Sequence, residues 1–304
     1  MSGRPNLSNK MAKSNSKIII LTILSLCFTG LIFVVWFQVS QHMRKSAEAQ
    51  THSSDPADLE FFETAYKFKK IKLDLSGKDV VAGVIPHHLL AADLIAEFFY
   101  NLREKKYDIV ILIGPNHFDT GESKMIASAY DWRTPYGRLE VDRGILNKIS
   151  GNELKIDEEA IKNEHAITSE GSFIKKIFPQ AKFLPIILKP SVTPEEASDL
   201  ARTLFDLSKN KKVLLLASVD FSHYKDSETA QKNDKESIAA ITDFSMDKIY
   251  GLDIDSPASI YTLLEYSQLN SAGFKLLNNS NSAILADKPD LKSTTSYVTG
   301  YFTK

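Results

Sequence analysis

The chain has 304 residues, of which 43% are hydrophobic and 25% charged, and its formal net charge at pH 7 is -1. This near-neutral balance gives no reason to expect a nucleic-acid partner, and the composition is that of an ordinary globular protein. Cys27 is the single cysteine, so disulfides and thiolate chemistry are excluded from the rest of the chain.

The N-terminal region contains an uncharged apolar run at 18–37. Its length matches the roughly 20 residues that cross a bilayer, and Trp36 lies near one end, as interfacial aromatics do. Four basic residues precede the run and two follow it, which favours a cytoplasmic N-terminus. A cleaved signal peptide with its site near Ala47–Ala49 is the alternative, but the run is longer than such peptides use. We therefore predict a single-pass anchor in the cell membrane, with the main domain outside the cytoplasm.

The prediction divides the chain into four parts. Residues 1–17 form a basic cytoplasmic terminus, 18–37 the transmembrane anchor, 38–58 a linker and 59–304 one folded domain. The linker is rich in Gln, Ser, Ala and Asp, and its histidines, His42 and His52, are interpreted as solvent-exposed.

From residue 59 onward, strand and helix patterns alternate. Short apolar, β-branched runs predict buried strands, and apolar residues at helical spacing predict helices. Strands are expected at 80–85, 107–113, 125–130 paired with 137–141, 183–188, 213–219, 282–286 and 294–302. Helices are expected at 91–105, at 194–207 with Thr193 as N-cap, at 226–242 and at 256–267. This order predicts a single α/β domain with a central mixed, mostly parallel sheet flanked by helices, preceded by the transmembrane helix.

Five of the seven histidines follow predicted strands or lie in the turns just beyond them: His87, His88, His117, His165 and His223. In an open α/β sheet, ligands bind in the crevice beyond the carboxyl ends of the strands. Imidazole is the commonest protein metal ligand and titrates near neutral pH. The pattern therefore predicts that these side chains converge on a metal or acid–base site.

Each motif also has a purely structural interpretation. Pro86-His87-His88 and Gly114-Pro-Asn-His117 are compatible with ordinary turns. Asp220 can orient His223 as a ligand or general base, or it can simply cap a helix. Glu164-His165 alone is typical of a solvated loop, since it follows an acidic stretch.

Over roughly residues 75–300 the chain resembles the Memo family, which includes AmmeMemoRadiSam system protein B. The resemblance is carried by an ordered set of segments: Ile85-Pro-His87, Leu112-Ile-Gly-Pro-Asn-His117, Thr134-Pro-Tyr-Gly-Arg-Leu-Glu-Val-Asp142, Glu164-His-Ala-Ile167, Leu184-Pro-Ile-Ile187, Ala217-Ser-Val-Asp-Phe-Ser-His-Tyr224 and Ser271-Ala-Gly273. It implies a fold similar to class III extradiol dioxygenases, which use non-haem iron. It also implies copper or iron bound through two histidines and a cysteine.

Transferred to this chain, the resemblance makes His87 and His117 the metal ligands and places Asp220 and His223 in the pocket. The family's cysteine corresponds to Ala272, which cannot ligate a metal. We therefore predict a harder site in which His87, His117 and His223 bind the metal with a carboxylate, suited to Fe(II), Zn or Mn rather than Cu(I). The remaining candidates for the pocket are His88, Glu164, His165 and Ala272.

Three functions follow from this site. The first is a metal-dependent oxidoreductase using iron, copper or zinc, in which His223, oriented by Asp220, transfers protons. The second is a non-catalytic module that binds a peptide or a small molecule in the same cleft. A zinc hydrolase would use the same ligands, but none of the recognisable hydrolase motifs is present.

Overall fold

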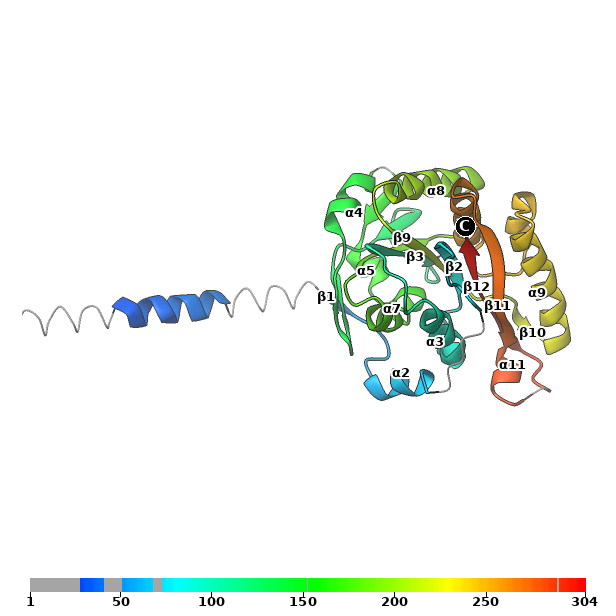
Figure 1. Ribbon diagram of the computed structural model, residues 1–304, viewed down its shortest axis with the longest axis horizontal. Helices are drawn as coiled ribbons and strands as arrows, with labels where there is room; N and C mark the ends of the chain where they lie inside the picture. Colours follow the sequence, from blue (N-terminus) through cyan, green and yellow to red (C-terminus); the bar gives the residue numbers. More distant parts are fainter. Residues whose placement is uncertain (1–27, 41–50, 68–72, 152, 289) are drawn as a thin grey trace, which may run out of the picture. The chain divides into compact units, whose positions relative to one another are not determined.

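A computed structural model describes residues 28–40, 51–67, 73–151, 153–288 and 290–304 (Figure 1). The chain divides into two compact units, 1–51 and 52–304. In the first unit, residues 28–40 are helical and exposed, whereas the first part of the predicted anchor, 18–27, lies outside the described residues. Within the described ranges, every helix is too short or too polar to cross a membrane.

A nine-stranded sheet forms the centre of the second unit, in the order β10-β12-β2-β9-β3-β8-β4-β7, with β11 also paired to β12. Its strands are β2 (Val80–Ile85), β3 (Ile109–Pro115), β4 (Met125–Ala127), β7 (Leu154–Ile156), β8 (Lys182–Leu188), β9 (Val213–Ser218), β10 (His223–Lys225), β11 (Gly273–Asn281) and β12 (Thr294–Thr303). The inner strands β2, β9, β3 and β8 run parallel. These four strands are almost wholly buried, as their near-continuous apolar character requires.

The sheet is mixed, as predicted, but it is not mostly parallel. Strands β10 and β11 both pair antiparallel with β12, and β12 pairs antiparallel with β2. At the other side, β4 is antiparallel to β8. Among the described strands of this sheet, four pairings are parallel and four are antiparallel. Three of the antiparallel pairings involve the C-terminal strand β12.

Helices flank the sheet, and α10 packs on β2, β9 and β3 while α8 packs on α10. On the chain's last strands, α9 lies along β11 and β12 (Figure 1). The helices are α2 (Leu59–Ala65), α3 (Ala92–Asn101), α4 (Arg143–Ile149), α5 (Glu158–Ile161), α6 (His165–Thr168), α7 (Gly171–Ile177), α8 (Pro194–Ser208), α9 (Ser227–Thr242), α10 (Pro257–Leu269) and α11 (Ser282–Leu285), with 3-10 turns η1 (Leu89–Ala91) and η2 (Met246–Gly251).

The start of α8 confirms its predicted capping residue. The Thr193 side chain accepts a hydrogen bond from the Glu196 backbone N–H, and the Glu196 side chain accepts one from the Thr193 N–H. This reciprocal pair satisfies two of the backbone donors that a helix start otherwise leaves without partners. The helix begins at Pro194, whose missing N–H costs nothing in the first turn.

Two other predicted elements are wrong. Residues 282–286 were expected as a strand, but Ser282–Leu285 is a short helix because the Asn281 side chain caps the Ile284 N–H. The strand before it, β11, was not predicted, since its half-exposed run of polar residues lacks an alternating pattern.

The predicted hairpin of 125–130 with 137–141 is also displaced. The hairpin actually joins β5 (Asp131–Thr134) to β6 (Gly137–Leu139), while β4 belongs to the main sheet.

His52 is not an exposed linker residue, contrary to the prediction. It lies in β1 (Thr51–Ser53), which joins β5 and β6 in a separate three-stranded sheet. Its ring centroid is 4.8 Å from that of Trp132, and its Nε2 lies 2.7 Å from Glu158 Oε2. The side chain is only 8% exposed. The folded unit therefore includes residues from His52 onward, seven residues earlier than the predicted boundary at 59.

Candidate metal centre

The candidate site is built at the carboxyl edge of the parallel strands. His87 follows the end of β2 by two residues, His117 follows the end of β3 by two, and Asp220 follows the end of β9 by two. His165 is the first residue of α6. Because β2, β9 and β3 are parallel neighbours, these positions meet at one edge of the sheet, where α/β proteins bind ligands.

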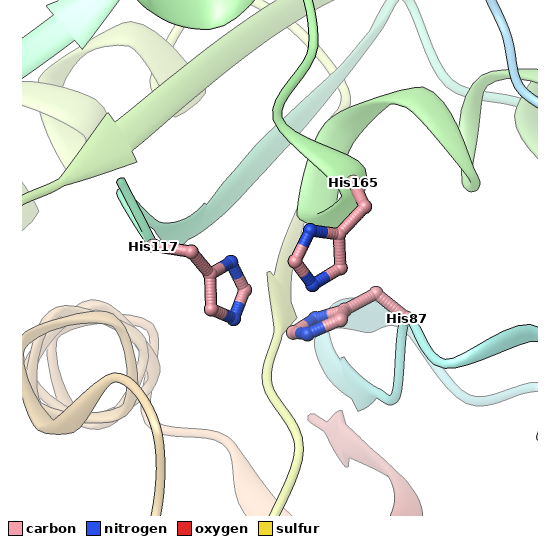
Figure 2. Close-up of side chains that lie close together, drawn as sticks. All are labelled: His87, His117 and His165. Carbon is pink, nitrogen blue, oxygen red and sulfur yellow. The ribbon is translucent and has the colours of Figure 1, made fainter. Parts of the chain in front are cut away.

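Three of the predicted histidines meet there, as Figure 2 shows. The rings of His117 and His165 stack with centroids 4.0 Å apart, and His87 stands edge-on to both at 5.1 and 5.0 Å. One ring nitrogen from each lies within 4.8 Å of the others. The side chain of His87 is buried, whereas those of His117 and His165 are 24% and 50% exposed. The site is therefore open on the side of His165.

Asp255 completes the cluster, and the sequence analysis missed it. Its Oδ2 lies 3.3 Å from His87 Nε2 and 3.6 Å from His117 Nε2. Its other oxygen, Oδ1, is buried and accepts no hydrogen bond from the described residues. Asp255 lies between η2 and α10 rather than after a strand, so strand-end reasoning did not select it.

The protein holds both imidazoles by their Nδ1 atoms. His117 Nδ1 lies 2.7 Å from Glu164 Oε1, and its backbone N–H donates to Glu164 Oε2 at 2.9 Å. His87 Nδ1 lies 3.2 Å from Ser218 Oγ. Metal-ligating histidines are usually oriented in this way by a carboxylate or another acceptor behind the ring. The two Nε2 atoms are thus left to face the same oxygen of Asp255.

The two Nε2–Oδ2 spacings approach those between ligands of a first-row metal ion. Two ligands bonded at about 2.1 Å lie roughly 3.0 Å apart in an octahedral arrangement and roughly 3.4 Å apart in a tetrahedral one. The Nε2–Oδ2 separations of 3.3 and 3.6 Å lie close to this range. With Oδ1 also unpartnered, Asp255 is a candidate ligand beside His87 and His117, each of which belongs to a possible ligand group within the described residues.

Asp220 supports His87 and Asp255 from behind. Its Oδ1 accepts the His87 backbone N–H at 3.1 Å, and its Oδ2 lies 3.7 Å from His87 Nε2. Its backbone N–H donates to Asp255 Oδ2 at 3.2 Å. Burial raises the pKa of Asp220, while the charge of His87 partly offsets that rise. The predicted pocket position of Asp220 thus coincides with a second possible ligand group of His87, Asp220 and Asp255.

The three histidines differ in pKa because their charged neighbours differ. Burial lowers the pKa of His87, but the Asp220 and Asp255 carboxylates outweigh burial and raise the pKa to about 10. Burial also lowers the pKa of His117, but the hydrogen bonds that His117 donates to Asp255 and Glu164 outweigh it and raise the pKa to about 9. For His165, burial and the charges of His117 and His87 lower the pKa to about 4. At pH 7 the metal-free site therefore holds two imidazolium ions and one neutral imidazole.

A second acid near the site was also not predicted as part of it. Glu170 is completely buried, and neither of its carboxylate oxygens has a hydrogen-bond partner among the described residues. Burial raises its pKa well above the usual value, and it interacts electrostatically with His87 and Asp220. Its place just after α6 gave no signal in the sequence, because the preceding residues suggested a solvated loop.

The remaining candidates lie outside both possible ligand groups, although the charge of His223 partly offsets the rise that burial causes in the pKa of Asp220. His223 is in β10, paired with Thr295 of β12, and it belongs to neither possible ligand group within the described residues. Its roles as ligand and proton carrier stay predictions. His88 is exposed and bonds the Tyr297 hydroxyl through Nδ1.

The structure does not bring Ala272 to the site. It precedes Gly273, which pairs with Thr303, and Thr303 pairs with Val80 at the start of β2. His87 follows the opposite end of β2, so the length of that strand separates Ala272 from it. Because β12 runs antiparallel to β2, the segment before β11 lies at the wrong edge of the sheet to supply a ligand.

Two imidazoles that follow central parallel strands, and a carboxylate from the segment before α10, together define a protein with a histidine–carboxylate centre. The profile of the family described as Memo-like protein matches residues 46–301. The chain therefore belongs to the Memo family, as the ordered motifs predicted.

Individual relatives agree with this assignment. A MEMO1 family protein of Desulfurococcus amylolyticus is 28% identical over 242 residues, which are 75% of this chain and 83% of that protein. One of Methanosarcina barkeri is 31% identical over 222 residues, covering 69% and 82%. A solved structure, of an uncharacterized protein from Escherichia coli K12, covers 72% of this chain and 99% of its own with 13% identity and a TM-score of 0.47.

Proposed function

We propose that this protein is a metal-dependent oxidoreductase whose ion is Fe(II), held by His87, His117 and Asp255. The observation that carries the proposal is the convergence of two Nε2 atoms on one Asp255 oxygen, while both Nδ1 atoms are engaged behind the rings. Two histidines and one carboxylate with open positions are typical of non-haem Fe(II) oxygenases. The absence of a thiolate from this set disfavours Cu(I).

The other residues of the site support this assignment. A bound iron would supply one-electron and oxygen chemistry, whereas the protein supplies orientation and proton transfer. Glu164 fixes the ring of His117, and Asp220 fixes the backbone of His87. His165 is neutral at pH 7 and half exposed at the open side, so we assign it the first contact with substrate.

The test is elemental analysis of the full chain, purified without added metal and without an affinity histidine tag. We expect near-stoichiometric iron in the wild type and its loss in the His87→Ala/His117→Ala variant. His223→Ala is the matched control, and we expect it to keep its metal. Stoichiometric zinc instead of iron would favour the hydrolase. A folded protein that takes up neither iron, zinc nor copper would favour the module that binds a peptide or a small molecule.

We also propose that residues 18–37 anchor the protein in the cell membrane, with the metal centre outside the cytoplasm. The uncharged run and the excess of basic residues before it support this proposal. The protein should stay in the membrane fraction after alkaline carbonate washing, and protease added outside the cytoplasmic membrane should digest its main domain. Release by carbonate, or complete protection from the protease, would contradict the anchor or its orientation.

A further inference from the structure

A cavity of about 430 Å³ lies at the opposite edge of the sheet from the metal centre. It is formed by the start of β2 and β9, the segment before β3, and the ends of α8 and α10. His87 follows the far end of β2, so the strand's length separates this cavity from the histidines. The volume lies within the range of small-molecule sites, roughly 300–1,000 Å³.

The side chains around the cavity are strongly basic. Five lysines line it against two carboxylates, although the whole chain has a net charge of -1: Lys105, Lys106, Lys211, Lys212 and Lys304 against Asp79 and Glu104. A concave surface lined by one sign of charge focuses the field and concentrates counter-ions.

Two of the five lysines already have partners. The Lys105 ammonium donates to two backbone carbonyls at 2.8 Å each, and Lys211 pairs with Asp142 at 3.2 Å. Lys106, Lys212 and Lys304 form no ion pair with any carboxylate in the described part of the chain. Three ammonium groups around the cavity are therefore available to an anion.

Helix ends explain part of this charge but not all of it. α8 ends at Ser208 and α10 at Leu269, beside the cavity, and a helix C-terminus carries about half a negative charge. Lysines near such ends are favourable for that reason alone. The helix ends do not account for Lys106, Lys212 and Lys304, which have no carboxylate partner among the described side chains.

The interior of the cavity adds polar side chains. Tyr266 lines it, and its buried hydroxyl interacts with Ser208 and Asn270, which line the same cavity. Tyr107 and Val213 provide apolar contact beside it.

We propose that this cavity binds a small, free phosphate compound carrying more than one negative charge. Phosphate oxygens would accept hydrogen bonds from the unpaired lysines, and such charge-assisted bonds are the strong ones. The apolar wall would contact the rest of the compound. The site is separate from the metal centre and does not depend on the proposed oxidoreductase function.

The test is calorimetric titration of the metal-free full chain with sodium pyrophosphate at low ionic strength. We expect binding that weakens as salt is added, because the attraction is screened. Lys106→Ala/Lys212→Ala should weaken it by about tenfold or more, since two charge-assisted contacts are lost. The His87→Ala/His117→Ala variant should bind as the wild type does, which places the anion away from the metal centre.

Lys232→Ala/Lys235→Ala is the matched control, because it removes the same charge from exposed positions of α9. Less than a twofold change is expected in this variant. An equal loss in both lysine variants would show a general charge effect and overturn the proposal. It would also be overturned if the wild type bound no pyrophosphate at millimolar concentration, or if binding disappeared with His87 and His117.

Discussion

Replacing Glu164 with glutamine tests how the site orients its ligand. The Glu164 side chain is fully buried and accepts three hydrogen bonds, from His117 Nδ1 at 2.7 Å, His117 N at 2.9 Å and Ala166 N at 3.1 Å. Burial raises the pKa of Glu164, but the hydrogen bond and charge of His117 outweigh it and lower the pKa overall. The carboxylate is therefore ionised and holds the Nδ1–H tautomer of His117, which leaves Nε2 free for a metal.

Glutamine keeps one acceptor oxygen and replaces the other with an NH₂ donor. Both oxygens of Glu164 accept hydrogen bonds from His117. In the glutamine variant, the NH₂ group therefore faces one of these two N–H donors and that hydrogen bond is lost. Losing one charge-assisted hydrogen bond in a buried position costs about 1.5–3 kcal/mol. If that loss falls on the metal-bound orientation of His117, metal affinity drops by roughly 10- to 100-fold.

The assay is a chelator-competition titration with Fe(II), excluding oxygen, and Glu158→Gln is the matched control. Glu158 also accepts from an imidazole, with its Oε2 2.7 Å from His52 Nε2, and it also receives a backbone N–H, from Ala129. It lies outside both possible ligand groups. We expect less than a twofold change in the control. Unchanged affinity in Glu164→Gln, or an equal loss in Glu158→Gln, would refute the proposed orienting role.

Three further predictions follow. Asp255→Ala should leave the chain folded but reduce metal content well below stoichiometry, and elemental analysis showing full occupancy would exclude Asp255 as a ligand. In the presence of a chelator, the metal-free protein should lose thermal stability between pH 7 and 10. The pKa values of His87 and His117 are about 10 and about 9, above the usual 6.5. The stabilisation that these two imidazolium groups provide is therefore complete below pH 6.5 and disappears as they deprotonate. A melting temperature that rises over that interval would contradict these pKa values. Thr193→Ala should cost about 1 kcal/mol in denaturant unfolding through loss of the α8 cap, and no change would argue against the capping box.

Much of the fold could be predicted because the central strands carry their own signal. β2 was predicted with the observed bounds, and β3, β8 and β9 lie within two residues of their predicted ends. Strands buried on both faces require continuous apolar runs, which are visible in a sequence. β11 could not be found because its environment is half exposed, so burial imposes no period on its side chains.

The candidate site could be predicted only where strand order determines position. His87, His117 and Asp220 follow parallel neighbouring strands, so their meeting follows from topology. Asp255 reaches the same place from an irregular segment before α10, which no local pattern ties to the sheet. The sequence analysis placed Ala272 in the pocket because it could not reveal the pairing of β11 with β12. That antiparallel register puts Ala272 at the edge of the sheet opposite His87.

The central claim is that His87, His117 and Asp255 share one metal ion. Anomalous diffraction from crystals of the protein loaded with Fe(II), collected at the iron absorption edge, tests it most directly. We predict a single strong peak about 2.1 Å from His87 Nε2, His117 Nε2 and Asp255 Oδ2. A peak bound by His165 or His223 without Asp255, or no peak in protein soaked with excess iron, would contradict the account.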